Sequence, residues 1–166
     1  VHGFKHFWVH TMTSAEFRRE VEPAKKLIED LTGVRVLGHR APAFSLTLAM
    51  TWAFEVLAET GFRYDSSVYP IRGRRYGDPS APLGAFAPAG GGGLWEIPPS
   101  AIEFLGRRWP VCGGGYLRVF PYAVSRWALR RITRTRPGVV YVHPYDIEQA
   151  PARPAEADWP LARKLA

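Results

Sequence analysis

The fold class follows from residues 34–42, which read VRVLGHRAP. The first four of these residues are mostly apolar and β-branched, which predicts a short strand, and Gly, His, Arg and Pro follow directly. In α/β domains, ligand-binding side chains gather at the carboxyl ends of parallel strands. We therefore expect Arg40 to lie at such an edge.

A helix is predicted before this strand. Residues 13–16 (TSAE) form a capping box, and Gly33 supplies a C-terminal stop. Between them, apolar residues recur at three- and four-residue steps: Phe17, Val21, Ala24, Ile28 and Leu31. Because proline lacks a backbone donor, Pro23 should kink this helix or split it.

The same order repeats after the strand. Ser45 or Thr47 is expected to cap a second helix, with Leu48, Trp52, Val56 and Leu57 on its apolar face. Residues 62–64 predict a strand that ends at Asp65. Residues 66–93 are rich in Pro, Gly and Arg and predict a long loop, and residues 94–97 predict another strand.

The C-terminal part continues this pattern. The glycine-rich residues 112–116 predict a close approach of the backbone to a strand or a ligand, and a helix should begin at Pro121. Residues 139–142 (VVYV) indicate a buried strand that delivers His143 at its carboxyl end. Alternating helices and strands predict an α/β domain with a largely parallel sheet or barrel.

Composition excludes several protein classes. The chain has 166 residues, 46% of them hydrophobic, which is enough to bury a core and excludes general disorder. The single cysteine, Cys112, excludes an internal disulfide and is expected to be a buried thiol, and no apolar run is long enough to cross a bilayer. No targeting signal can be read at the start of the sequence. The cytoplasm and the cell envelope of a bacterium are therefore both possible locations of the protein.

The net charge of +7 is compatible with nucleic acid, an acidic polysaccharide or an anionic membrane. The arginines are spread over several segments, which favours a solvated surface over a specific nucleic-acid site.

His2 and His6 are the candidate metal ligands. They are four residues apart, as are His6 and His10, and on a helical turn this spacing puts imidazoles within reach of one divalent ion. Two histidines are one fewer than the three protein ligands of a catalytic zinc site. An exposed chain end without metal is the alternative interpretation.

His143, Arg40 and Asp65 are the candidate catalytic residues, because each follows a predicted strand. A histidine in this place can exchange a proton near neutral pH, although a backbone carbonyl could equally satisfy it. Arg40 suits either a carboxylate partner or a structural clamp, and Asp65 suits either a site or a turn. Trp95, Tyr116 and Tyr145 form a candidate sugar-stacking surface, with a role in the core as the alternative.

Five motifs occur in an order that resembles the polysaccharide deacetylase family, and more closely its exopolysaccharide-locus branch associated with exosortase systems. They are HGFKH (2–6), GHRAPAFS (38–45), YDSS (64–67), GGGYLR (113–118) and VHPYD (142–146). Each motif is weak alone, and together they cover the chain from His2 to about Pro154.

The resemblance implies a distorted (β/α) barrel with a divalent metal, usually zinc, held by one Asp and two His. His2 and His6 would be the metal histidines, and His143 would be the general acid that protonates the departing amine. Arg40 would orient the catalytic base, and Asp65 would support the wall of the site.

The chain also departs from the family pattern. The family's opening strand, which carries the base Asp and the metal-binding Asp, would lie before Val1, and neither Asp30 nor Asp78 replaces these residues by motif. Three further changes are mild: Val1 stands where a Ser commonly precedes the first histidine, His39 stands where Tyr is usual, and Tyr145-Asp146 replaces a Trp-Glu pair. We therefore expect a barrel that is incomplete at its N-terminus, with 1–154 as the C-terminal portion of a catalytic domain and 155–166 as a frayed tail.

The expected function is metal-dependent removal of N-acetyl groups from amino sugars of an exopolysaccharide, with this chain a weakly active or inactive form. Hydrolysis of another amide, such as a cyclic imide, is the alternative within enzymes. A carbohydrate-binding remnant without chemistry is the alternative outside them. An N-acetylated polysaccharide is the expected partner, and a specific nucleic acid is not.

Overall fold

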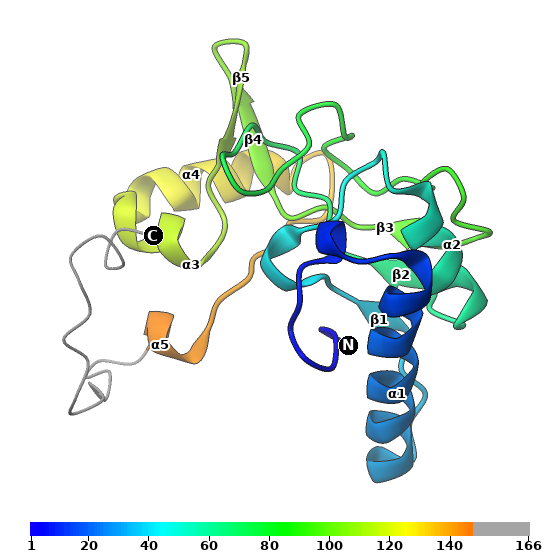
Figure 1. The fold of residues 1–166 in the computed structure, drawn as a ribbon. Helices are drawn as coiled ribbons and strands as arrows, with labels where there is room; N and C mark the ends of the chain where they lie inside the picture. Colours follow the sequence, from blue (N-terminus) through cyan, green and yellow to red (C-terminus); the bar gives the residue numbers. More distant parts are fainter. Residues whose placement is uncertain (148–166) are drawn as a thin grey trace, which may run out of the picture.

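The computed structural model describes residues 1–147, apart from the side chains of Tyr145 and Ile147. Figure 1 shows two parts, a parallel sheet with the helices α1 and α2, and an antiparallel hairpin with the helices α3 and α4. The predicted tail, 155–166, lies outside the described residues. No helix among residues 1–147 is long and apolar enough to cross a membrane.

The first part is a three-stranded parallel sheet in the order β1-β2-β3. Its elements are α1 (Ser14–Thr32), β1 (Gly38–His39), α2 (Thr51–Glu59), β2 (Tyr64–Asp65) and β3 (Trp95–Glu96). The main apolar core lies between these helices and the sheet, and it includes Phe17, Val21, Phe54, Leu57 and Phe62. Parallel pairing brings the carboxyl ends of all three strands to one edge.

The second part begins with an antiparallel hairpin. Its elements are β4 (Ala101–Phe104), β5 (Arg107–Pro110), α3 (Gly114–Val119), α4 (Tyr122–Ile132) and α5 (Pro144–Ile147). Short 3₁₀ helices, Val9–Thr11 and Pro42–Phe44, occur in the first part. The hairpin was not expected from the sequence, because its two-residue turn needs positive φ at both Leu105 and Gly106, and leucine rarely adopts that conformation.

The helix predicted around the capping box is confirmed. The Glu16 N–H donates to the Thr13 hydroxyl, the Glu16 side chain reaches back to the Thr13 N–H, and Gly33 ends the helix in the left-handed conformation. The prediction that Pro23 splits the helix is wrong, because α1 runs unbroken from Ser14 to Thr32. Packing of Phe17, Val21 and Ala24 in the core holds the turns on both sides of the proline.

The strand predicted over 34–37 is wrong in its bounds. The Val36 N–H donates to the Glu29 carboxylate at the end of α1 (2.8 Å), so it is not available to a neighbouring strand. Pairing starts only where the Leu37 carbonyl accepts from Arg63 and Tyr64.

The start predicted for the second helix is also wrong, because α2 begins at Thr51. The Ser45 hydroxyl cannot cap a helix, since it donates to the Pro42 carbonyl (2.6 Å) and accepts the Val9 N–H (2.9 Å).

Residues 139–142 do not form the predicted buried strand. Only Tyr141 makes a bridge, to Gly113, while Val139 bonds to Ser100 through both its N–H and its carbonyl. Val140 and Val142 are exposed. The mixed α/β class and the parallel sheet are confirmed, and closure into a barrel stays a prediction.

Candidate active site

His2 and His6 lie on a tight loop and not on the helical turn that their spacing suggested. The loop starts beside β1, because the N–H of Val1 donates to the Gly38 carbonyl (2.8 Å) and the Arg40 N–H donates to the Val1 carbonyl (2.9 Å). This pairing places His2 at the carboxyl end of β1.

The loop is closed by α1 and by two residues in the left-handed conformation, Gly3 and His6. The Glu20 carboxylate on α1 accepts the N–H groups of Phe4 (3.1 Å) and Lys5 (2.7 Å). A positive φ at a non-glycine residue costs free energy, so the loop is held by these bonds.

The two imidazoles face each other through their Nε2 atoms, which are 3.2 Å apart. A tetrahedral ion about 2.05 Å from each nitrogen would hold the two nitrogens about 3.3 Å apart. The pair therefore has the separation of two ligands of one metal ion. Without a metal, the same distance suits a hydrogen bond between the rings.

The orientation of His2 is fixed by a second contact. Its Nδ1 lies 2.7 Å from the Arg40 carbonyl, so Nδ1 carries a proton and Nε2 keeps a lone pair. Burial lowers the pKa of His2, and the bond to Arg40 only partly opposes this. A neutral imidazole is the form that binds metals.

A third ligand is not assembled around this pair. Within residues 1–147, no group of three or more His, Cys, Asp or Glu side chains is placed to hold a metal ion. His10 packs against Trp8, with ring centroids 5.3 Å apart. The residues present thus fit two positions of a metal site.

Arg40 joins the ends of β1 and β2. Its Nε donates to the Ser66 carbonyl (2.9 Å) and its Nη2 donates to the Ser66 hydroxyl (2.7 Å). The guanidinium also lies 5.8 Å from the ring centre of Phe44. Arg40 therefore acts as a structural clamp between the residues that follow β1 and β2. Its role in orienting a catalytic base stays a prediction.

A row of buried polar side chains crosses the sheet, and its member on β1 directly precedes Arg40. His39, Asp65 and Glu96 are aligned in register on the three strands. His39 Nδ1 lies 2.7 Å from Asp65 Oδ1, and both side chains are fully buried. Asp65 was expected from the sequence and Glu96 was not, since the only signal for Glu96 was an acidic residue inside an apolar strand.

The row is tied to the loops that follow the strands. The Ser67 hydroxyl donates to Asp65 Oδ1 (2.7 Å) and accepts the Ala41 N–H (2.7 Å). Glu96 Oε1 accepts the N–H groups of Ser67 (3.0 Å) and Val68 (2.9 Å). Because Asp65 is enclosed, its geometry fits support of the site wall better than contact with a substrate.

The two carboxyl groups of the row have opposite pKa shifts. Burial raises the pKa of Glu96 to about 11, and the adjacent Asp65 charge adds to this shift. Burial alone would also raise the pKa of Asp65, but the hydrogen bond and charge of His39, with further bonds from Glu96 and Ser67, hold it below its usual value. At neutral pH Asp65 is therefore ionised, and Glu96 beside it is a neutral acid.

His143 lies at the start of α5 and is oriented by Asp146. The His143 N–H donates to Asp146 Oδ2 (2.8 Å), and His143 Nδ1 lies 3.3 Å from the same oxygen. The Asp146 side chain is 2% exposed, and its Oδ1 lies 3.2 Å from the Arg118 Nε. The His143 bonds and the Arg118 charge outweigh burial and lower the pKa of Asp146, so Asp146 is an anion beside the imidazole.

Aromatic contacts connect the two histidine regions. The Phe44 ring lies beneath Arg40 and packs edge-on against Tyr141 (4.8 Å between centroids), and Tyr141 packs against His143 (6.1 Å). Any side chain at Gly113 would collide with the Tyr141 ring, which confirms the predicted close approach. A chain of ring contacts thus links the end of β1 to the segment before α5.

The three sugar-stacking candidates are not brought together. Tyr116 belongs to this aromatic cluster, its hydroxyl lies 2.9 Å from that of Tyr76, and it lines a groove of about 790 Å³ beside the hairpin. Trp95 is half exposed and precedes Glu96, so it faces the opposite side of the sheet from the buried row. The Tyr145 side chain lies outside the described residues.

Comparison with known proteins adds two findings. A family model described as "Domain of unknown function (DUF3473)" matches residues 66–164. A solved structure, that of a "putative polysaccharide deacetylase" from Mycobacterium smegmatis, matches with a TM-score of 0.55 and 20% sequence identity, covering 87% of this chain and 48% of that one. No curated protein matches. The chain thus has the fold of about half of that structure.

Proposed function

Because the chain belongs to the DUF3473 domain family, whose function its description leaves open, we propose an activity from the geometry of its site. The chain contributes to a metal-dependent polysaccharide deacetylase that removes N-acetyl groups from amino sugars. The observation that carries the proposal is the pair of facing Nε2 atoms, 3.2 Å apart, on His2 and His6. The likeness in fold to the Mycobacterium smegmatis structure supports it.

The metal would be held by His2 and His6, with at least one further ligand. When bound, a divalent ion such as Zn²⁺ polarises a carbonyl and activates water. The Arg40 carbonyl keeps His2 in the tautomer that binds, and Glu20 keeps the loop closed so that His6 stays opposite His2. With only these two ligands, the chain itself should bind zinc weakly and release little acetate.

His143 would supply the proton of the reaction. In hydrolysis of an N-acetyl group, water adds to the carbonyl carbon, the C–N bond breaks, and the nitrogen takes up a proton as acetate and the amine are released. Asp146 orients the His143 ring through its Oδ2 atom. The Nε2 atom of His143 can then donate a proton to the departing nitrogen.

The substrate proposed is an N-acetylated exopolysaccharide. Tyr116 and the groove beside it offer an aromatic wall of the kind that stacks on sugar rings. Hydrolysis of another amide, such as a cyclic imide, would use the same histidines. Binding of carbohydrate without chemistry would use the aromatic wall alone.

The test is acetate release from N-acetylglucosamine oligomers by the product of the whole reading frame, with zinc content measured beside it. His143→Ala should lower kcat by about 10²–10⁴-fold with little change in KM, because a general acid acts on the leaving group in the transition state. His2→Ala should remove both the metal and the activity.

Asp30→Ala, on the exposed side of α1, is the control and should change neither quantity. Full activity that survives a chelator, or a His143→Ala variant with an altered KM and an unchanged kcat, would contradict the proposed roles.

A further inference from the structure

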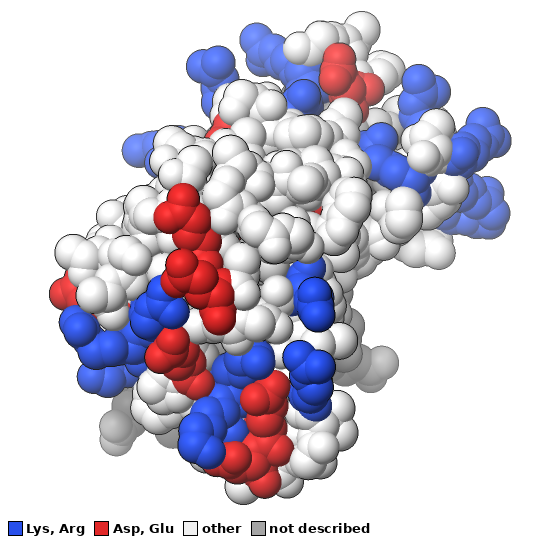
Figure 2. Space-filling model, turned by 90° about the vertical axis from the view of Figure 1, so that its right-hand side faces the viewer, with Lys and Arg blue, Asp and Glu red and all other residues white. Residues whose placement is uncertain are grey.

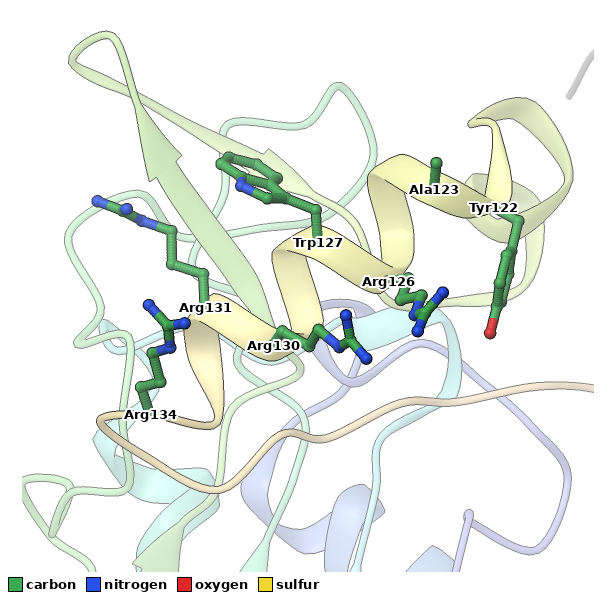
Figure 3. A pocket seen from close by; sticks show the side chains of 7 residues that line it. All are labelled: Tyr122, Ala123, Arg126, Trp127, Arg130, Arg131 and Arg134. Carbon is green, nitrogen blue, oxygen red and sulfur yellow. The ribbon is translucent and has the colours of Figure 1, made fainter.

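The outer face of α4 carries a cluster of arginines with two aromatic side chains. A hollow of about 470 Å³ is lined by Arg126, Arg130, Arg131 and Arg134, together with Tyr122 and Trp127. Figure 3 shows these arginines spread around the exposed side of the helix, with Trp127 rising on the side of the hairpin. No Asp or Glu occurs between Glu103 and Asp146, so no acidic residue of α4 neutralises the cluster.

A second hollow adjoins the first and is almost wholly apolar. It holds about 400 Å³ between α4 and the hairpin, and its walls include Phe104, Trp109, Val111 and Val124. Trp127 lines both hollows, so the cationic and apolar surfaces are continuous. The Phe104 and Trp127 rings pack edge-on at 6.0 Å, which fixes the boundary between them.

The apolar side chains here extend to the tip of the hairpin. Leu105, at the turn, is 85% exposed, and Trp109 and Trp127 are 43% and 47% exposed. A contiguous apolar surface of this kind usually marks an interaction site. We call it, together with the arginines of α4, the hairpin–α4 surface.

The charge around this surface is mainly positive, with Glu103 as the acidic residue of the hairpin. Figure 2 views the side that lies on the right in Figure 1; Lys and Arg predominate toward its top, with one acidic group among them, whereas acidic and basic side chains alternate over α1. The ion pairs of α1, such as Lys26 with Asp30 and Arg18 with Glu22, account for that alternation. The hairpin adds Arg107 and Arg108, of which only Arg108 lies near an acid, Glu103 at 3.9 Å.

We propose that the hairpin–α4 surface binds a bilayer of anionic phospholipids. The arginines contact lipid phosphates, while Leu105 and the two tryptophans enter the boundary between headgroups and acyl chains. An acidic polysaccharide or a nucleic acid would satisfy the arginines but would leave the apolar hollow uncovered. The adjoining apolar and cationic surfaces therefore favour a lipid surface.

The test is flotation of the chain with vesicles of phosphatidylcholine, with and without phosphatidylglycerol. Binding should require phosphatidylglycerol and fall as salt rises, because phosphate contacts are screened. Arg126→Gln and Arg130→Gln should each weaken binding about fivefold, and together about 25-fold. Leu105→Ser should weaken it roughly tenfold, because it removes apolar area from the interface.

The matched controls are Arg19→Gln and Leu31→Ser on α1, which change the same residue types on the opposite part of the molecule and should leave binding unchanged. Circular dichroism is used to check that each variant folds. If Leu105→Ser does not fold, Trp127→Ser replaces it as the test of the apolar contact. Three results would overturn the proposal. The first is binding that does not depend on phosphatidylglycerol. The second is loss of binding in the arginine variants but not in the apolar variants, as expected for a site that binds a polyanion. The third is self-association of the chain through this surface in place of vesicle binding.

Discussion

The parallel sheet and the hairpin–α4 surface use charged residues in opposite ways. In the sheet, His39, Asp65 and Glu96 are enclosed side by side on three strands, and His39 is hydrogen-bonded to Asp65. On α4, arginines stand on the outer face, with no acidic residue in the helix. Enclosed polar groups fix the geometry of the strand ends, whereas outward charges are available to a partner.

This difference predicts different consequences of mutation. Substitutions in the buried row should lower the free energy of unfolding, because each leaves a polar partner unpaired in the interior. Substitutions on α4 should change binding and leave folding intact. The following variants test this contrast from the largest expected effect to the smallest.

Asp65→Ala should have the largest effect. It removes the partner of both His39 and Glu96 and should lower the free energy of unfolding by about 3–5 kcal/mol. Urea denaturation followed by circular dichroism measures the loss. Asp30→Ala, which breaks an exposed ion pair on α1, is the control and should cause no measurable change; equal losses in the two variants would show that the row does not stabilise the sheet.

Arg40→Ala should have an intermediate effect. The variant loses two hydrogen bonds to Ser66 and the contact with Phe44. Its free energy of unfolding should therefore be lower by about 2–3 kcal/mol. Arg130→Gln, on α4, should stay within about 0.5 kcal/mol of the original chain. Urea denaturation curves of the two variants measure this difference. Coinciding curves would contradict the contrast between the sheet and α4.

Glu96→Gln should have the smallest effect near pH 5, about 1 kcal/mol or less, because Glu96 is protonated in the folded chain and glutamine is a neutral group of nearly the same shape. Since the pKa of Glu96 is raised to about 11 on folding, the native state holds a proton that the unfolded chain releases above its ordinary pKa. Stability should therefore fall as pH rises from about 5 toward 11, with a slope of at most about 1.4 kcal/mol per pH unit.

The Glu96→Gln variant should lose that slope, and thermal unfolding from pH 6 to pH 9 measures it. Asp65 does not interfere in this range, since its lowered pKa changes stability only under acidic conditions. Parallel pH profiles for the two proteins would mean that Glu96 is already ionised in the folded chain.

The sequence determined the features that depend on neighbouring residues. The capping box of α1, the glycine at its end, the long loop over 66–93 and the helix after Pro121 are all confirmed. The helix ends are set by hydrogen bonds within a few residues along the chain, and the loop follows from its local content of Pro and Gly. The spacing of His2 and His6 also pointed to a pair, although the turn that joins them was predicted as helical.

Tertiary structure decided the rest. Glu96 was missed, and the strands at 34–37 and 139–142 were misplaced, because strand bounds depend on partners about 26 residues or more away. The same long-range pairing puts His39, Asp65 and Glu96 in one row and seats His2 against the Arg40 carbonyl. A local pattern cannot specify such contacts, since register, burial and the pKa shifts that follow arise only when distant segments pack together.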